Sequence, residues 1–231
     1  MVSSVDFFLY STRLIFFFSA FNTDGFDVTG KNVWIHDCKI WNQDDCIAVK
    51  DGSENMLFER IHASGLGLVI GSIGGSTVRN ITFRDSYMHK TYKGIYTKFR
   101  GSGLIQDVLY ENIVMFEPEQ WPIWIGPAQQ ADSIDICKAD PCSLCWPDIP
   151  FAECNMPADA QYINLTLRNI TVINPASSGV ILGSTKNHIQ NLTFDGVVIK
   201  NAPADYFVCS NVVNGIATGG TFPVPSCFNK K

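Results

Sequence analysis

The sequence has no excess of basic residues. Its 17 lysines and arginines are outnumbered by 22 aspartates and glutamates, and the formal net charge is -5. Nucleic-acid-binding domains carry a basic face, so this balance argues against a nucleic-acid partner. A basic site must therefore be local, and the densest group of cationic side chains consists of Lys90, Lys93, Lys98 and Arg100.

Long hydrophobic runs and cofactor motifs are also lacking. The Phe-rich segment from Val5 to Phe21 is interrupted by Arg13, which is unlike a membrane-spanning helix, and we expect no membrane partner. No glycine-rich phosphate loop is present. The histidines show no spacing typical of metal ligands or of a catalytic triad. We therefore expect neither a cofactor nor a metal ion.

Residues 1–21 leave three interpretations open. The run from Leu14 to Ala20 is similar to a signal-peptide core that ends in small residues, but no basic region precedes it. The segment is otherwise the start of a truncated chain, or a genuine strand. In each case we expect the main domain to comprise residues 22–231.

The eight cysteines are even in number, which favours disulfides. Four of them crowd one insertion at about residues 131–160, namely Cys137, Cys142, Cys145 and Cys154. Cys142-x-x-Cys145 is also compatible with a metal site, but no second Cys or His pair has zinc-finger spacing. Cys38 and Cys46 are candidates to pair, and Cys209 and Cys227 are predicted to close a C-terminal loop.

The cysteines and four N-x-S/T sequons indicate a secreted, extracellular glycoprotein. The sequons begin at Asn80, Asn164, Asn169 and Asn191. The same asparagines also fall at the turns of a repeat, which is an equally good reason for their presence.

That repeat is one phrase that returns six times. It begins at Asn32, Asn55, Asn80, Asp107, Asn164 and Asn191, with steps of 23, 25, 27, 57 and 27 residues. The long step is one repeat, or two weak ones, carrying the cysteine-rich insertion. Each phrase alternates apolar and polar residues, and a second short apolar strand follows most of them. A period in the twenties with two or three strands predicts an all-β parallel β-helix, or solenoid.

Three carboxylates gather in two tight groups, Asp24 and Asp44-Asp45. Like charges held close raise one another's proton affinity, and glycoside hydrolysis uses a protonated carboxyl beside an ionised one. A simpler alternative is that they are turn aspartates bonded to the backbone. Equivalent positions of successive coils lie about 4.8 Å apart, so the two groups should face one groove. Leu66, Tyr96, Lys98 and Trp124 are predicted to line the same groove, which is long enough for a polymer.

Three motifs resemble the polygalacturonases of glycoside hydrolase family 28. They are Asn22-Thr23-Asp24-Gly25, Asp44-Asp45-Cys46 and Gly71-Ser72-Ile73-Gly74. The resemblance implies a right-handed parallel β-helix and inverting hydrolysis of α-1,4 bonds between galacturonic acids in pectin. It makes Asp44 the general acid, makes Asp24 and Asp45 the groups that activate water, and places Asn22 and Lys98 in substrate binding. An inverting pair is expected to be about 6.5–9.5 Å apart.

Two departures from the family pattern bear on the substrate. Gly65-Leu66-Gly67 stands where the family has Gly-His-Gly, and Tyr96-Thr97-Lys98 stands where it has Arg-x-Lys. Losing the arginine removes a bidentate carboxylate clamp that a lysine does not replace. Tyr96 and Trp124 either stack on sugars instead or simply pack. We expect the groove to accept a modified or less acidic polysaccharide.

The resemblance also implies further coils before Asn22, which this chain is expected to lack. Two alternatives to an active, monomeric glycosidase therefore stay open. One is a catalytically impaired β-helix that binds polysaccharide, and the other is a fragment of a longer enzyme.

Overall fold

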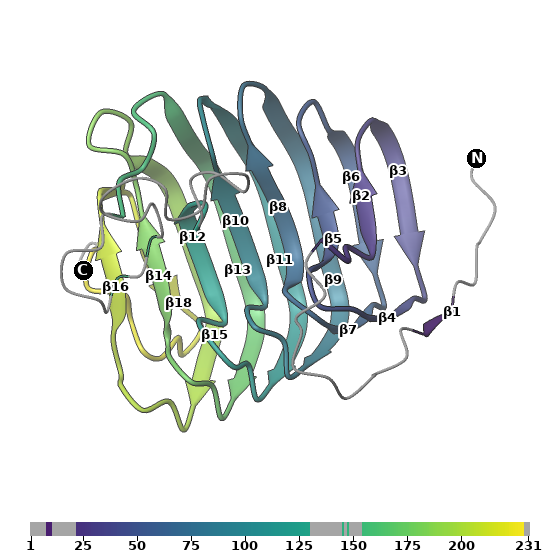
Figure 1. The fold of residues 1–231 in the computed structure, drawn as a ribbon. Helices are drawn as coiled ribbons and strands as arrows, with labels where there is room; N and C mark the ends of the chain where they lie inside the picture. The colour runs from purple at the N-terminus through teal and green to yellow at the C-terminus, as the bar shows by residue number, and fades with distance from the viewer. Residues whose placement is uncertain (1–7, 11–21, 130–144, 146, 148–153, 229–231) are drawn as a thin grey trace.

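A computed structural model describes residues 8–10, 22–129, 145, 147 and 154–228, and these residues form strands without any helix. The described part of the chain therefore contains no helix that could cross a membrane. Successive coils stack along one axis from β3 at one end to β16 at the other, as a parallel β-solenoid (Figure 1). The predicted all-β solenoid is thus confirmed.

Two parallel sheets run the length of the solenoid. The larger sheet contains β1 (Phe8–Tyr10), β3 (Lys31–His36), β4 (Lys39–Trp41), β6 (Glu54–Glu59), β7 (His62–Ser64), β9 (Thr77–His89), β11 (Gly103–Phe116), β13 (Ala160–Ile173), β15 (Ile189–Lys200), β17 (Val212–Val213) and β18 (Ile216–Thr218). The second sheet contains β2 (Phe26–Val28), β5 (Asp45–Val49), β8 (Gly67–Ile73), β10 (Ile95–Phe99), β12 (Ile123–Pro127), β14 (Gly179–Leu182) and β16 (Phe207–Ser210).

The residue that begins each repeat phrase has a structural reason to be Asn or Asp. All six adopt a left-handed backbone conformation with φ between 55° and 59°, which these residue types tolerate best after glycine. Their side chains also bond from coil to coil. Asn80 donates to Asn55 at 2.8 Å, and Asn191 donates to Asn164 at 2.9 Å. The phrase therefore marks a turn that every coil repeats.

The long repeat step is a single coil with an insertion. Residue 103 of β11 pairs with residue 160 of β13, and the pairing continues in register to Phe116 and Ile173. The chain leaves the solenoid after β12 and returns at β13, in the region where the insertion is predicted. Most of that insertion lies outside the described residues.

The core lies between the two sheets and is built from aliphatic and aromatic ladders. Phe58, Phe83 and Tyr110 stack across three coils with ring centroids 4.7 and 4.9 Å apart. Each ring is almost completely buried. Burial of rings of this size supplies much of the hydrophobic stabilisation of such a fold.

The structure tests part of the cysteine predictions. Cys209 is bonded to Cys227, as predicted, and Cys145 is bonded to Cys154. Cys145 is therefore not a thiolate ligand of a metal site, while Cys137 and Cys142 lie outside the described residues. Cys38 and Cys46, the candidates to pair, are not bonded to each other. Their thiols instead donate to the carbonyl of His36 and to Oδ1 of Asn42.

Of the predicted N-terminal segment, the structure describes only β1. Its three residues pair in parallel with β4, Phe8 against Lys39 and Tyr10 against Trp41. The predicted signal-like run from Leu14 to Ala20 lies outside the described residues.

Candidate active site

Two acidic motifs come together because they occupy adjacent coils. The backbone N–H of Asn22 donates to Oδ2 of Asp44 at 3.0 Å, and the N–H of Gly25 donates to the carbonyl of Asp45 at 2.9 Å. Between them, Oγ1 of Thr23 accepts from the N–H of Gln43. A Cβ at Gly25 would collide with the carbonyl of Cys46, so only glycine fits beside Asp24. The spacing of the two motifs is thus the length of one coil.

Asn42 organises the turn that carries Asp44 and Asp45. Its Nδ2 lies within 2.7–2.9 Å of the carbonyls of Thr23, Asp44 and Asp45. One side chain therefore holds backbone groups of both coils. Sequence reasoning did not single out Asn42, although its position just before the acidic pair was a usable signal.

The three carboxylates lie closer together than predicted. One oxygen of each of Asp24, Asp44 and Asp45 lies within 4.8 Å of an oxygen of the others. The expected 6.5–9.5 Å separation assumed a lateral offset between the coils. The bond from Gly25 to Asp45 shows instead that the motifs stack directly. One water molecule can still bridge two of these oxygens, since each hydrogen bond needs about 2.7–2.8 Å.

This crowding changes the proton affinity of Asp24. Burial, followed by the charges of Asp44 and Asp45, raises the pKa of Asp24 from 3.8 to about 7. Burial also raises the pKa of Asp45, against the opposing effect of Lys98. The carboxyl of Asp44 is held differently, because both oxygens accept backbone N–H groups, from Asn22 and Asp45. The group of three carboxyls therefore keeps one proton up to about neutral pH.

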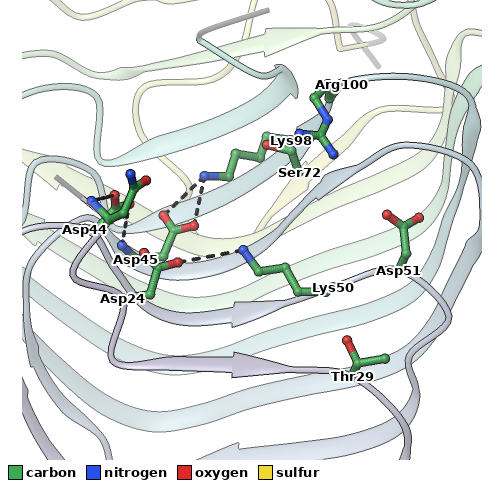
Figure 2. A pocket seen from close by; sticks show the side chains of 10 residues that line it. Asp24, Thr29, Asp44, Asp45, Lys50, Asp51, Ser72, Lys98 and Arg100 are labelled. Atoms are coloured by element: carbon green, nitrogen blue, oxygen red, sulfur yellow. Dashed lines mark hydrogen bonds and ion pairs between the residues drawn. The ribbon is translucent and has the colours of Figure 1, made fainter. Parts of the chain in front are cut away.

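Two lysines balance the remaining negative charge. Nζ of Lys98 contacts both oxygens of Asp45, at 2.9 and 3.2 Å, and the side chains are only 12% and 3% exposed. Burial disfavours the ammonium of Lys98, but Asp45 outweighs it and raises the pKa of Lys98. Nζ of Lys50 lies 3.7 Å from Asp24 (Figure 2). The same Nζ lies 2.9 Å from Asp27. The carboxylates could in principle hold a cation, but these ammonium groups already supply positive charge there.

The carboxylates open into a polar cavity of about 560 Å³. All ten lining residues are polar or charged, and they are Asn22, Asp24, Thr29, Asp44, Asp45, Lys50, Asp51, Ser72, Lys98 and Arg100. Figure 2 shows Asp24, Asp44 and Asp45 grouped at one end, with Asp51 and Thr29 toward the other. Such a lining suits a ligand with many hydroxyl groups better than an apolar one.

The structure brings five of the seven predicted site residues to this cavity: Asn22, Asp24, Asp44, Asp45 and Lys98. Trp124 and Tyr96 are the exceptions. Trp124 is 0% exposed and donates to the carbonyl of Pro127, and Tyr96 is 3% exposed. Their rings offer no open face for a sugar, which corrects the expectation of stacking. The physical reason is a second apolar cluster on the outer face of the sheet, where both rings pack with Cys145 of the insertion.

Leu66 occupies the predicted place in the next coil. Its N–H donates to the carbonyl of Asp44 at 2.7 Å, so the two residues are direct neighbours along the solenoid. Its side chain is not among the residues that line the cavity. Leu66 therefore adds no polar group to the site.

The predicted basic cluster divides into separate environments. Lys98 and Arg100 line the cavity, whereas Lys93 is 1% exposed beneath Tyr96. Its Nζ donates to Oε1 of Gln120 and Gln129, and burial lowers its pKa to about 7. Lys90 contacts Glu117 at the surface.

Sequence reasoning did not single out Lys50, Asp51, Thr29 or Ser72. Lys50 follows β5, two residues after Ala48, whose side chain lies on the outer face. Side chains two apart in a strand share a face, so this alternation could have identified Lys50. Thr29 and Asp51 follow the ends of β2 and β5, and Ser72 lies in β8 where the pairing with β10 shifts in register, so simple alternation does not point to a face for them.

Several named proteins are similar in sequence. A probable rhamnogalacturonase C of Aspergillus flavus is 38% identical over 96 residues, covering 40% of this chain and 21% of that protein. A probable endopolygalacturonase of Neosartorya fischeri is 30% identical over 197 residues, covering 83% of this chain and 48% of that protein. The chain thus spans no more than about half the length of these relatives.

Two solved structures share the fold. The endo-xylogalacturonan hydrolase from Aspergillus tubingensis superimposes with a TM-score of 0.65 at 19% identity, over 90% of this chain and 54% of that one. Endopolygalacturonase I from Stereum purpureum, complexed with two galacturonate, gives a TM-score of 0.53 at 24% identity, over 85% and 55%. At these identities the likeness concerns the fold.

The model of the glycosyl hydrolases family 28 matches residues 2–218, a span that contains both acidic motifs and the whole cavity. This match confirms the resemblance of the motifs, and the chain belongs to glycosyl hydrolase family 28.

Proposed function

We propose that the chain carries the catalytic centre of a glycoside hydrolase that cleaves pectin-type polysaccharide. The observation that carries the proposal is the group formed by Asp24, Asp44 and Asp45, which retains one proton near neutral pH inside a polar cavity. Family membership and the names of the relatives support pectin as the substrate class.

The proposed chemistry separates the carboxyls into an acid and a base. Asp44 protonates the oxygen of the leaving sugar, while Asp24 and Asp45 hold and deprotonate the attacking water. The proton of the group is available to Asp44, because its neighbours lie within 4.8 Å and one water can relay it. Lys98 favours the ionised form of Asp45, which a base requires, and so opposes the effect of burial on this carboxyl.

Inversion at the anomeric carbon is part of the proposal. The 4.8 Å approach alone is closer to the spacing of retaining enzymes, about 5–5.5 Å. Yet both oxygens of Asp45 contact Lys98, and both oxygens of Asp44 accept backbone N–H groups. Carboxylates whose oxygens are held in this way are poorly placed to attack carbon, which favours water as the nucleophile.

Product stereochemistry and an Asp44→Asn variant test this function. The parent should release reducing ends from homogalacturonan, xylogalacturonan or rhamnogalacturonan, and proton NMR should show the inverted anomer first. Asp44→Asn should lose at least about 100-fold in rate while retaining polysaccharide binding. A parent chain that binds but never hydrolyses would instead support the alternative of a non-catalytic polysaccharide-binding solenoid.

Secretion belongs to the same proposal. The disulfides Cys145–Cys154 and Cys209–Cys227 are typical of proteins that fold in an oxidising compartment. A polysaccharide of the cell wall is reached only outside the cell. Detection of the chain in culture medium, with non-reducing mass spectrometry of its cysteines, would test this assignment.

A further inference from the structure

Two outward side chains of β10 and the residue that follows the strand form one wall of the site. Ile95 and Phe99 point into the core, so Tyr96 and Lys98 lie on the opposite face, and Arg100, the residue after the strand, lines the same cavity as Lys98. Tyr96 is buried, and its ring lies 4.5 Å from Nζ of Lys98. Its hydroxyl accepts from the N–H of Gln129. Tyr96 therefore packs against Lys98 without reaching the cavity, which is lined by Lys98 and Arg100.

The three cations of the cavity differ in what they contact. Lys50 is paired with Asp24 and Asp27, and Lys98 is paired with both oxygens of Asp45. The guanidinium of Arg100 forms no hydrogen bond or ion pair with any residue that the structure describes. It is exposed and lines the cavity. Of these cations, Arg100 alone can accept a new anionic partner without breaking an existing pair.

Arg100 lies along one wall beside a second unused polar group. The backbone N–H of Arg100 donates to the carbonyl of Ile73, which places Arg100 next to Ser72 in the neighbouring coil (Figure 2). The Ser72 side chain also lines the cavity, and its hydroxyl forms no hydrogen bond with another residue that the structure describes. Asp51, the remaining acid of the lining, is bonded to the N–H of Gly74 and the hydroxyl of Ser76. A guanidinium beside a hydroxyl is a suitable pair of donors for a carboxylate.

The catalytic end of the cavity is unfavourable for a second acid. Three carboxylates lie there within 4.8 Å, and the ammonium of Lys98 is already bonded to Asp45. A carboxylate of the substrate placed at that end would find both ammonium groups already engaged by protein carboxylates, and would have no free cationic partner there. Arg100 lies two residues beyond Lys98, about 7 Å along the strand, and is far enough to act on a different sugar unit.

We propose that Arg100 and Ser72 form a carboxylate subsite displaced from the catalytic carboxyls, so that the polymer is recognised by a uronic acid at Arg100 and carries a neutral or esterified sugar beside Asp45. This inference rests on the proposed function and names its substrate class: a polymer in which acidic and uncharged sugars alternate. The family pattern has its arginine at the position of Tyr96. Arg100 lies four residues further along the chain, about 13 Å in an extended conformation.

Equilibrium binding separates this subsite from the catalytic function. The probes are an alternating rhamnose–galacturonate oligosaccharide, its carboxyl-reduced form, and a fully acidic oligogalacturonate of equal length, titrated into Asp44→Asn to prevent turnover. The alternating oligosaccharide should bind at least about 10-fold more tightly than its carboxyl-reduced form. It should also bind more tightly than the fully acidic oligosaccharide.

Arg100→Gln, made in the same background, should remove the preference over the carboxyl-reduced form and leave the affinity of that form unchanged. Arg100→Lys is the matched control, which keeps the charge without the planar fork and should retain only part of the preference. The proposal would be overturned if Arg100→Gln lost affinity equally for the alternating oligosaccharide and for its carboxyl-reduced form. Equal or tighter binding of the fully acidic oligosaccharide by the parent, or no binding of any probe, would also overturn it.

Measurement of hydrolysis distinguishes failure of the proposed hydrolase function from failure of the subsite. If the Asp44-containing chain binds the alternating oligosaccharide with this selectivity but cleaves none of the probes, the proposed hydrolase function fails and the subsite stands. If it cleaves all three with the same kcat/KM, the function stands and the subsite fails.

Discussion

The three carboxyls of Asp24, Asp44 and Asp45 share one proton, and this proton predicts how activity depends on pH. Its pKa of about 7 means that the group carries a proton below that pH and loses it above. Glycoside hydrolysis needs one protonated and one ionised carboxyl, so the singly protonated form is the active one. We expect kcat/KM to fall by about tenfold per pH unit above about pH 7. This holds whichever of the carboxyls carries the proton in the free protein.

Lys50→Met should move the alkaline limb of the pH profile, which is the fall in kcat/KM above neutral pH, in a defined direction. Nζ of Lys50 lies 3.7 Å from Oδ2 of Asp24, and its cation favours the ionised carboxylate. Two unit charges at this distance interact by about 1.1 kcal/mol at the dielectric constant of water, which corresponds to about 0.8 pKa units. We use the value for water because the lysine and aspartate side chains are 31% and 22% exposed. Removing the cation should therefore shift the limb upward by about one pH unit.

The assay is the initial rate of reducing-end release at subsaturating pectic substrate, from about pH 5 to about pH 9. Lys50→Arg keeps the charge and is the control, so its limb should coincide with that of the parent. A parallel titration of the labelled Asp24 carboxyl by carbon NMR reports the same pKa without turnover. A limb that stays in place or moves downward in Lys50→Met would refute the electrostatic reasoning, and so would a rate that rises above neutral pH.

Three further outcomes follow from buried or repeated contacts. Lys98→Met leaves the buried Asp45 without its cation and should lower the free energy of unfolding by about 3 kcal/mol, measured by urea denaturation. Adding Asp45→Asn should recover most of this loss, and no recovery would contradict the pairing. Asn164→Ala should cost about 2 kcal/mol, because Asn164 has a φ of 56° and bonds to both neighbouring coils, whereas Asn164→Gly should cost less. The folded pKa of Lys93, about 7, lies below its ordinary value of 10.5, so the unfolded chain binds the extra proton between these values and stability should rise with pH there. Thermal unfolding of Lys93→Met should show a flatter rise than the parent, and parallel profiles would count against a buried amine.

The coil architecture was predictable because its signal is local. A left-handed turn residue must recur once per coil, and Asn32, Asn55 and Asn80 record that requirement directly in the sequence. The long step between Asp107 and Asn164 was ambiguous for the same reason. A pattern of turn residues cannot distinguish one coil with an insertion from two degenerate coils, and only the pairing of β11 with β13 resolves it.

The carboxylates were predictable from their density, but their surroundings were not. Trp124 follows the alternation of an outward-facing residue, yet it is fully buried, because an apolar cluster that includes Cys145 lies over the outer face. Alternation gives the side of a sheet and not what covers it. Lys50 continues the alternation of β5 but was missed, because one isolated lysine suggests no role until its coil is stacked on that of Asp24.

The geometry that makes the site reactive also limits what it can recognise. Parallel coils place equivalent positions about 4.8 Å apart, so two acidic turns on adjacent coils are forced together. Lys50 and Lys98 offset this repulsion, and both are thereby engaged by protein carboxylates. A uronate of the substrate must then be bound by a cation outside these pairs, and Arg100 fulfils that condition within the described cavity. Proton retention by the carboxyls and a displaced subsite for an acidic sugar are thus two consequences of the same stacking.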